Sequence, residues 1–276
     1  MTVGFVDIDR AGRPVRIEHA WLGDDAAAPL VVFLHEGLGS LSMWRDFPAQ
    51  LCLQARCRGL VYSRPGYGRS TPRAAEEAWG LDFMHRQALE VLPALLAALH
   101  IDQPVWLFGH SDGGSIALLH AALRPAQTAG VIVLAPHIHV EDLSVSSIEA
   151  TRRAYETTDL RTKLARHHDD PDSAFWGWNR IWLHPPFRDW SIEDEIASIA
   201  CPLLAVQGLD DEYGTLEQIR GIARRVPQAR LLELPDCGHS PQRDQPAALL
   251  AAAAAFIAEV VAEASAEFTA PSSRDT

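Results

Sequence analysis

One short segment constrains the fold of this chain more than any other. Residues 105–108 are a wholly apolar run typical of a buried strand, and residues 115–123 have the pattern of a helix. Between them stands Gly-His-Ser-Asp-Gly, centred on Ser111. A Gly-x-Ser-x-Gly sequence between a strand and a helix is typical of a very sharp turn, where larger side chains at the glycine positions would collide with neighbouring elements. The segment therefore predicts a serine hydroxyl lifted clear of a sheet and facing the N-terminus of a helix.

The rest of the chain repeats the alternation of buried strands and helices. Short apolar runs, each typical of a strand buried on both faces, occur at residues 30–34, 60–62, 131–134, 203–206 and 230–234. Helical patterns occur at residues 43–55, 81–99, 216–226 and 247–264, and residues 3–8 and 15–21 predict an N-terminal hairpin. This alternation predicts an α/β fold, with a mainly parallel sheet flanked by helices on both faces.

One interval interrupts this alternation. Residues 137–200 contain no convincing buried strand, but they contain helical pieces and four tryptophans, Trp176, Trp178, Trp182 and Trp190. A stretch of this length must have structure of its own. We therefore predict a helical cap insertion at 137–200 within a core domain formed by residues 1–136 and 201–268, followed by a disordered tail at 269–276. The tryptophans favour an apolar pocket wall and ordinary packing of the insertion about equally.

A serine hydroxyl is a poor nucleophile at neutral pH and needs a neighbouring base. His239 lies in the loop after the last predicted strand, where the preceding glycine lets the backbone turn the imidazole inward. The base in turn needs an acid to orient it. The loop after residues 203–206 offers Asp210, Asp211 and Glu212. The chain order serine, acid, histidine is typical of a fold in which the nucleophile lies on such a turn.

The sequence resembles the α/β-hydrolase superfamily from about residue 30 to residue 260. The loop His-Glu-Gly-Leu-Gly at residues 35–39 is similar to the family's His-Gly-x-x-Gly, with Glu36 in place of a glycine. Residues 63–70 are similar to Asp-x-x-Gly-x-Gly-x-Ser, with Ser63 in place of the aspartate. The resemblance implies that the N–H groups of Gly37 and Asp112 form an oxyanion hole. It also selects Asp211 as the acid, through a Gly-x-x-Asp motif.

The resemblance implies a serine hydrolase that cleaves a small carboxylic ester through an acyl-enzyme, with a Ser-His-Asp triad. In the superfamily the same triad also opens lactones and hydrolyses carbon–carbon bonds of ring-fission products, and thioesters are a further possibility. The sequence leaves these substrates open. A ligand-binding protein without catalysis on the same scaffold is the alternative from another functional class. Leu38, His137 and Trp178 are expected to line the substrate pocket, since ligands bind at the carboxyl edge of open α/β sheets.

Composition and charge limit the kinds of binding partner that this chain is expected to have. The formal net charge of −12 argues against nucleic acid as the main partner and gives no basic face for an anionic membrane. We find no signal peptide and no apolar stretch of the ~18 residues that span a bilayer, so we expect a cytoplasmic protein that acts on a small molecule. His137 and His139 could share a face of a strand, but no third ligand is spaced to join them, so we expect neither metal nor cofactor. The oligomeric state is left open.

Overall fold

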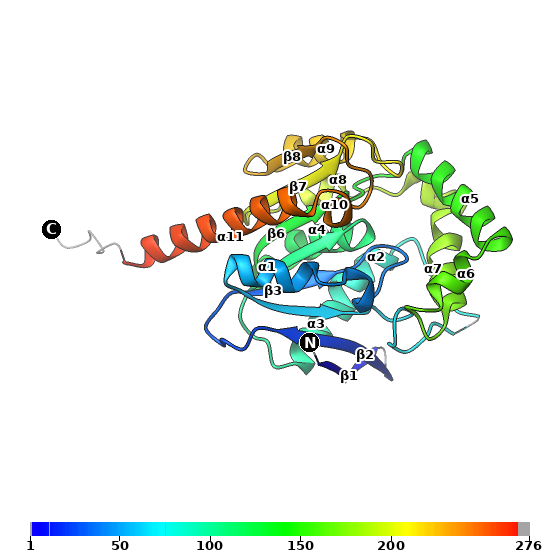
Figure 1. The fold of residues 1–276 in the computed structure, drawn as a ribbon, viewed down its shortest axis with the longest axis horizontal. Helices are drawn as coiled ribbons and strands as arrows, with labels where there is room; N and C mark the ends of the chain where they lie inside the picture. Colours follow the sequence, from blue (N-terminus) through cyan, green and yellow to red (C-terminus); the bar gives the residue numbers. More distant parts are fainter. Residues whose placement is uncertain (1, 11, 75, 270–276) are drawn as a thin grey trace.

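Eight strands form one sheet in the order β1-β2-β4-β3-β5-β6-β7-β8 in the computed structural model, which describes residues 2–10, 12–74 and 76–269 (Figure 1). The strands are β1 (Val3–Arg10), β2 (Arg13–Leu22), β3 (Leu30–Leu34), β4 (Arg58–Tyr62), β5 (Val105–His110), β6 (Thr128–Leu134), β7 (Leu203–Gly208) and β8 (Arg230–Leu234). β1 and β2 form the predicted antiparallel hairpin, and β2 also runs antiparallel to β4. The remaining neighbours are parallel, which confirms the predicted fold class.

β3, β5 and β7 are buried at every position because both faces of the sheet are covered. In β3, Val31 and Phe33 point to one face, whereas Val32 and Leu34 point to the other, and all four are fully buried. The helices are α1 (Phe47–Ala55), α2 (Phe83–Arg86), α3 (Leu92–Ala98), α4 (Asp112–Leu123), α5 (Asp142–Thr157), α6 (Leu160–Leu164), α7 (Pro171–Trp182), α8 (Glu193–Ile196), α9 (Glu217–Arg225), α10 (Pro241–Asp244) and α11 (Pro246–Thr269). α1 and α11 pack together on one face, and α4 packs with α2 and α8 on the other.

The helix predicted at residues 81–99 is not uniform. α2 leads into a π-helical turn, η2 (Gln87–Val91), before α3 begins. Pro93 has no N–H to donate to the carbonyl of Leu89, so an ordinary α-helical ladder cannot run through this point. The pattern of apolar residues predicted the helical segment correctly, but not this change of pitch.

The segment between β6 and β7 contains α5, α6 and α7, which lie together at one end of the sheet (right side of Figure 1). α7 is joined to the loop after β4, because the Ser173 hydroxyl donates to the carbonyl of Gly66 and accepts the N–H of Arg73. The last helix of this segment, α8, packs on α4 and α9 of the core. The predicted insertion is therefore helical, and its final turn lies among the core helices.

α11 corrects one expectation from the sequence. Its segment Pro246–Ala266 is long and apolar enough, by length and composition, to cross a membrane. The sequence analysis found no apolar stretch of this length, because alanines supply much of the apolar character of the segment. Leu249, Ala253 and Ile257 are buried against the core, whereas the end of the helix extends away from the sheet (Figure 1). Of the predicted disordered tail, Thr269 ends α11, and residues 270–276 lie outside the described residues.

Candidate active site

Ser111 lies on the sharp turn between β5 and α4 that the sequence predicts. Its backbone angles, φ 52° and ψ −120°, are a strained conformation for a residue with a side chain. A Cβ atom on Gly109 would overlap the carbonyl oxygen of Gly113, and one on Gly113 would overlap that of Leu34. Both glycines are therefore required for the turn to pack against β3 and its own helix.

Ser111, His239 and Asp211 form one continuous chain of hydrogen-bonding groups. The Ser111 Oγ lies 2.9 Å from Nε2 of His239, and Nδ1 of the same ring lies 2.8 Å from Oδ1 of Asp211. The neutral imidazole that donates from Nδ1 to the carboxylate presents its Nε2 lone pair to the serine hydroxyl. This arrangement can remove the hydroxyl proton as the oxygen attacks a carbonyl carbon.

The Asp211 carboxylate is held by several donors. Oδ1 accepts the N–H of Tyr213, and Oδ2 accepts the side-chain amide of Gln207. Burial raises the pKa of Asp211, but the hydrogen bond and charge of His239 outweigh burial and leave that pKa below its usual value. Asp210, the neighbouring candidate from the sequence, is exposed, and Nδ1 of His239 pairs with Asp211 instead. The geometry thus singles out Asp211, the residue that the Gly-x-x-Asp resemblance selects.

Gly37 and Asp112, the expected oxyanion donors, line the same small cavity as Ser111. Asp112 is the first residue of α4, and N–H groups at this position have no acceptor within the helix. A Cβ atom on Gly37 would overlap the indole ring of Trp178, so the loop after β3 passes directly against α7. Both residues therefore lie in the wall of the cavity beside Ser111, and the role of their N–H groups as oxyanion donors stays a prediction.

Glu36, which replaces a family glycine in this loop, is paired rather than free. Its Oε2 lies 3.5 Å from Nδ1 of His110, and Nε2 of His110 donates to the backbone carbonyl of His239 over 2.6 Å. Burial raises the pKa of Glu36, but the His110 contact outweighs burial and lowers that pKa to about 2. The Glu36–His110 pair thereby joins the oxyanion loop to the loop of the base. Sequence reasoning missed this pair, since no local signal links positions so far apart.

The cavity beside Ser111 has a volume of about 120 Å³. Leu38, His137 and Trp178, which the sequence predicts as pocket residues, all line it. Burial is the main cause that lowers the pKa of His137 to about 3, so this imidazole is neutral at physiological pH. The prediction omitted Ile148 and Tyr213, which also line the cavity and carry no motif that could have identified them.

The four tryptophans divide between the two interpretations that the sequence left open. Trp178 and Trp182 line the cavity, and Trp182 Nε1 donates to the Asp112 carboxylate over 3.1 Å. Trp190 is buried against other rings of the insertion, and Trp176 lies beside two arginines away from Ser111. Two of the rings therefore form pocket wall, and two stabilise the insertion.

Ser63 departs from the family pattern, and the structure supplies a carboxylate from another strand. The Ser63 hydroxyl donates to Oε2 of Glu18 on β2 over 2.7 Å, and the same oxygen accepts the N–H of Arg69. Ser63 Oγ also accepts the N–H of Leu41. Ser63 and Glu18 together thus fix the loops after β3 and β4, next to the candidate site.

Known proteins of similar sequence and structure include several enzymes. A 2-succinyl-6-hydroxy-2,4-cyclohexadiene-1-carboxylate synthase from Enterobacter sp. (strain 638) is 25% identical over 256 residues, which cover 83% of this chain and 92% of the relative. A 2-hydroxy-6-oxo-6-phenylhexa-2,4-dienoate hydrolase from Burkholderia cepacia is 24% identical over 268 residues, covering 87% and 91%. The structure of a thermophilic esterase from Thermogutta terrifontis superposes with a TM-score of 0.72 at 18% identity, covering 94% of this chain and 99% of that one. The family model for the alpha/beta hydrolase family matches residues 31–253, and this chain belongs to that family.

Proposed function

We propose that this protein is a serine hydrolase that cleaves a small carboxylic ester through an acyl-enzyme. The observation that carries the proposal is the unbroken contact from Ser111 Oγ through His239 to Asp211. His239 takes the hydroxyl proton as Ser111 Oγ attacks the carbonyl carbon, and returns it to the departing alcohol oxygen. Water, activated by the same imidazole, then releases the acid and restores the serine.

The oxyanion of each tetrahedral intermediate is stabilised by the N–H groups of Gly37 and Asp112. Such preorganised donors typically supply the largest single part of the rate enhancement. The Glu36 carboxylate opposes this charge least when the His110 imidazole beside it is protonated. The small volume of the cavity and its Leu38, Ile148 and Trp178 side chains favour a short, apolar acyl group.

Hydrolysis of a carbon–carbon bond is the second candidate. The Burkholderia cepacia relative is named for hydrolysis of a dienoate, and it matches most of this chain. The same serine, base and oxyanion donors could serve that reaction. Lactone opening stays within the ester mechanism, because a lactone is a cyclic ester.

The test is a substrate panel run on the wild-type protein beside Ser111→Ala. It contains p-nitrophenyl esters of increasing acyl length, simple lactones and a dienone ring-fission product. We expect kcat/KM to be highest for the shortest acyl chains and to fall as the chain outgrows the cavity. Preferred turnover of the dienone would favour the second candidate. Absence of turnover for every compound would favour a binding protein on this scaffold.

A further inference from the structure

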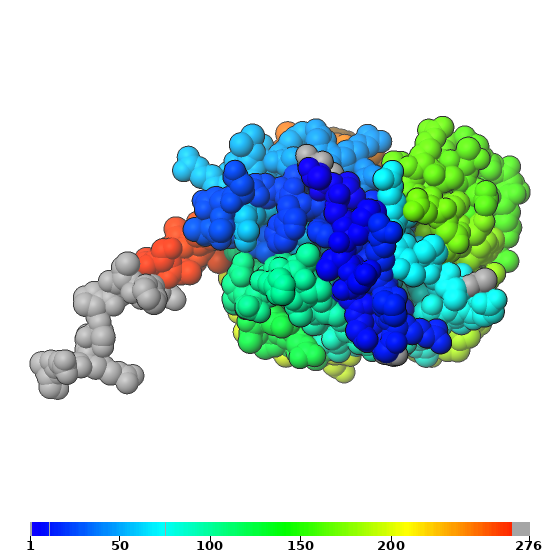
Figure 2. Space-filling model, turned by 90° about the horizontal axis from the view of Figure 1, so that it is seen from below, coloured from blue at the N-terminus to red at the C-terminus, as the bar shows by residue number. Residues whose placement is uncertain are grey.

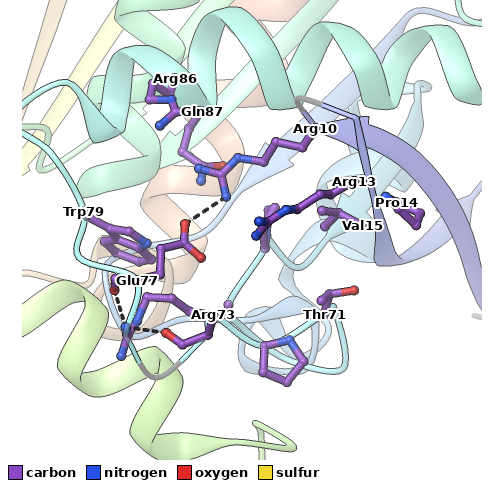
Figure 3. A pocket seen from close by; sticks show the side chains of 14 residues that line it. Arg10, Arg13, Pro14, Val15, Thr71, Arg73, Glu77, Trp79, Arg86 and Gln87 are labelled. Atoms are coloured by element: carbon purple, nitrogen blue, oxygen red, sulfur yellow. Dashed lines mark hydrogen bonds and ion pairs between the residues drawn. The ribbon is translucent and has the colours of Figure 1, made fainter.

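A second and larger cavity, of about 460 Å³, lies apart from Ser111 (Figure 3). The β1–β2 hairpin, the segment after β4 and the junction of α2 with η2 line it, and it shares no lining residue with the cavity beside Ser111. Figure 2 shows the hairpin on the surface beside the segment after β4, with the helical insertion adjoining. The volume lies within the range of roughly 300–1,000 Å³ that is typical of small-molecule sites.

The cavity lies at the sheet edge where α/β proteins bind ligands. β2 runs antiparallel to β4 and pairs His19 with Tyr62, the last residue of β4. The first residues of β2 therefore extend beyond the carboxyl end of β4. Ser111 follows the carboxyl end of β5, which is two places along the sheet from β4. Ligands of open α/β sheets bind outside this edge.

The charges around the cavity are unbalanced toward positive. Arg10 and Arg13 stand directly opposite each other in the hairpin register, an arrangement that destabilises a strand pair when the charges are alike. Glu77 pairs with Arg10 at 3.3 Å. Figure 3 shows both arginine side chains reaching from the hairpin into the same space. Glu77 alone offsets only part of the repulsion between Arg10 and Arg13, and a bound anion would reduce it further.

Two more arginines line the same cavity. Arg86 is paired with Glu90 at 3.2 Å, and the Arg73 guanidinium donates to the backbone carbonyls of Ala74 and Glu77, which carry no net charge. Four arginines and one carboxylate, Glu77, therefore line the cavity, while Glu90, Asp82 and Asp170 act on Arg86 and Arg73 from outside the lining. This local excess of positive charge occurs in a chain whose formal net charge is −12.

A buried amide completes the polar lining. The Gln87 side chain is only 5% exposed, and its Oε1 has no hydrogen-bond partner among the described residues. Buried polar atoms are rarely left without a partner, so either end of this amide is available to a ligand. Gln87 also begins the π-helical turn η2, and such turns are frequent at functional sites. Trp79 adds a flat apolar wall to the same cavity.

We propose that this cavity is a second ligand site, which binds a small organic anion. Its carboxylate or phosphate oxygens are held by Arg10 and Arg13, because guanidinium groups match the planar geometry of such anions. A polar group of the ligand reaches Gln87, and its ring or conjugated part packs against Trp79. The site needs neither Ser111 nor turnover.

The test is isothermal titration calorimetry on the full-length protein with three probes: phenyl phosphate, inorganic phosphate and benzyl alcohol. We expect saturable 1:1 binding of phenyl phosphate, weaker binding of inorganic phosphate and none of benzyl alcohol. Arg13→Gln and Gln87→Leu should each raise the Kd of phenyl phosphate, Arg13→Gln by about tenfold or more. Arg16→Gln is the matched control, since Arg16 lies on the same strand but covers the Phe5 ring instead of the cavity.

Protein phosphonylated at Ser111 should bind phenyl phosphate with an unchanged Kd, which separates this site from the proposed hydrolase chemistry. Three results would overturn the proposal. The first is that neither phenyl phosphate nor inorganic phosphate binds saturably. The second is that Arg13→Gln and Arg16→Gln raise the Kd of phenyl phosphate equally. The third is that phenyl phosphate no longer binds after phosphonylation of Ser111. Circular dichroism confirms that each variant is folded. If the Arg13→Gln protein were unfolded, the Gln87→Leu protein alone would test the proposed site. An unchanged Kd of phenyl phosphate in Gln87→Leu would then contradict the proposal.

Discussion

At the scale of single residues, the contacts that hold Ser111, His239 and Asp211 have two kinds of cause, one local and one spread over the chain. The glycines around Ser111 have a local steric cause, and the sequence carries that cause within five positions. The Glu36–His110 pair has no such local cause. It depends on which rotamers fit between the loops after β3, β5 and β8, and only the assembled structure determines that. The sequence therefore predicts reacting groups better than the groups that hold them.

Asp211→Asn should reduce kcat on a short p-nitrophenyl ester by roughly 10⁴-fold, since an amide would hold His239 in the wrong tautomer. The matched change Asp210→Asn should alter kcat by about twofold at most, because Asp210 is exposed and Nδ1 of His239 pairs with Asp211 instead. Steady-state kinetics of the two variants side by side decide the assignment. A larger loss in Asp210→Asn would reverse it.

Glu36→Ala should reduce kcat by roughly tenfold to a hundredfold, because His110, left with Gln242 as its partner at Nδ1, fixes the backbone beside His239 less firmly. Glu36→Gln should restore most of the rate, since its amide oxygen can still accept a hydrogen bond from His110. KM for a small ester should change little in both variants. Unchanged kcat in Glu36→Ala would show that the pair has no positioning role.

Asp112→Asn should stabilise the protein at neutral pH. Burial raises the pKa of Asp112 to about 6, against the opposing effects of Arg64 and Trp182. A carboxyl group whose pKa is higher in the folded than in the unfolded protein stabilises the fold most at pH values below its pKa in the unfolded protein. This stabilisation is lost as pH rises from about 4 to about 6. The asparagine avoids that loss and can still accept the Trp182 N–H.

Urea denaturation checks this prediction at two pH values. Asp112→Asn should exceed the wild type by up to about 3 kcal/mol in the free energy of unfolding at pH 8, and the difference should vanish near pH 3.5. Groups that titrate identically in both proteins cancel in this comparison. A variant less stable than the wild type at pH 8 would contradict the burial of a charged carboxylate.

At the scale of helices and strands, apolar runs predicted the central buried strands because both faces of the sheet are covered there. The prediction of a buried strand at residues 230–234 was wrong, because β8 lies at the edge of the sheet and is partly exposed. The sequence also predicted helical pieces within residues 137–200, where the structure has α5, α6 and α7. It could not predict the π-helical turn η2, because the pitch depends on the missing N–H of Pro93 and on packing against α4. It also could not divide the tryptophans, because pocket wall and packing residues have the same apolar composition.

The division of the tryptophans leads to a matched pair of variants in α7. Trp178→Ala should change the ranking of esters by acyl length, since Trp178 lines the cavity and lies against Gly37. Trp176→Ala should leave the ranking unchanged and lower only the melting temperature, because this ring lies between arginines outside the cavity. Kinetics on the ester panel and thermal denaturation separate these effects. An equal loss of rate for all esters in Trp178→Ala would show that the Trp178 ring does not determine acyl-chain specificity.

At the scale of the whole molecule, the sheet order brings two cavities to one edge of a single domain. The family resemblance predicts the site at β5, because its motifs are local and specific. The arginine-lined cavity has no motif, since it arises from the register of the β1–β2 hairpin against a segment more than fifty positions later. A chain this acidic also gave no reason to expect a local excess of positive charge.

The central claim is that Ser111 is an activated nucleophile. Its most direct test is intact-protein mass spectrometry after brief treatment with a fluorophosphonate, with peptide mapping of the adduct. The account predicts one phosphonyl group per chain, located on Ser111, no adduct in Ser111→Ala, and much slower labelling in Asp211→Asn. A wild-type protein that stays unmodified, or one labelled at another residue with equal speed in Ser111→Ala, would contradict it.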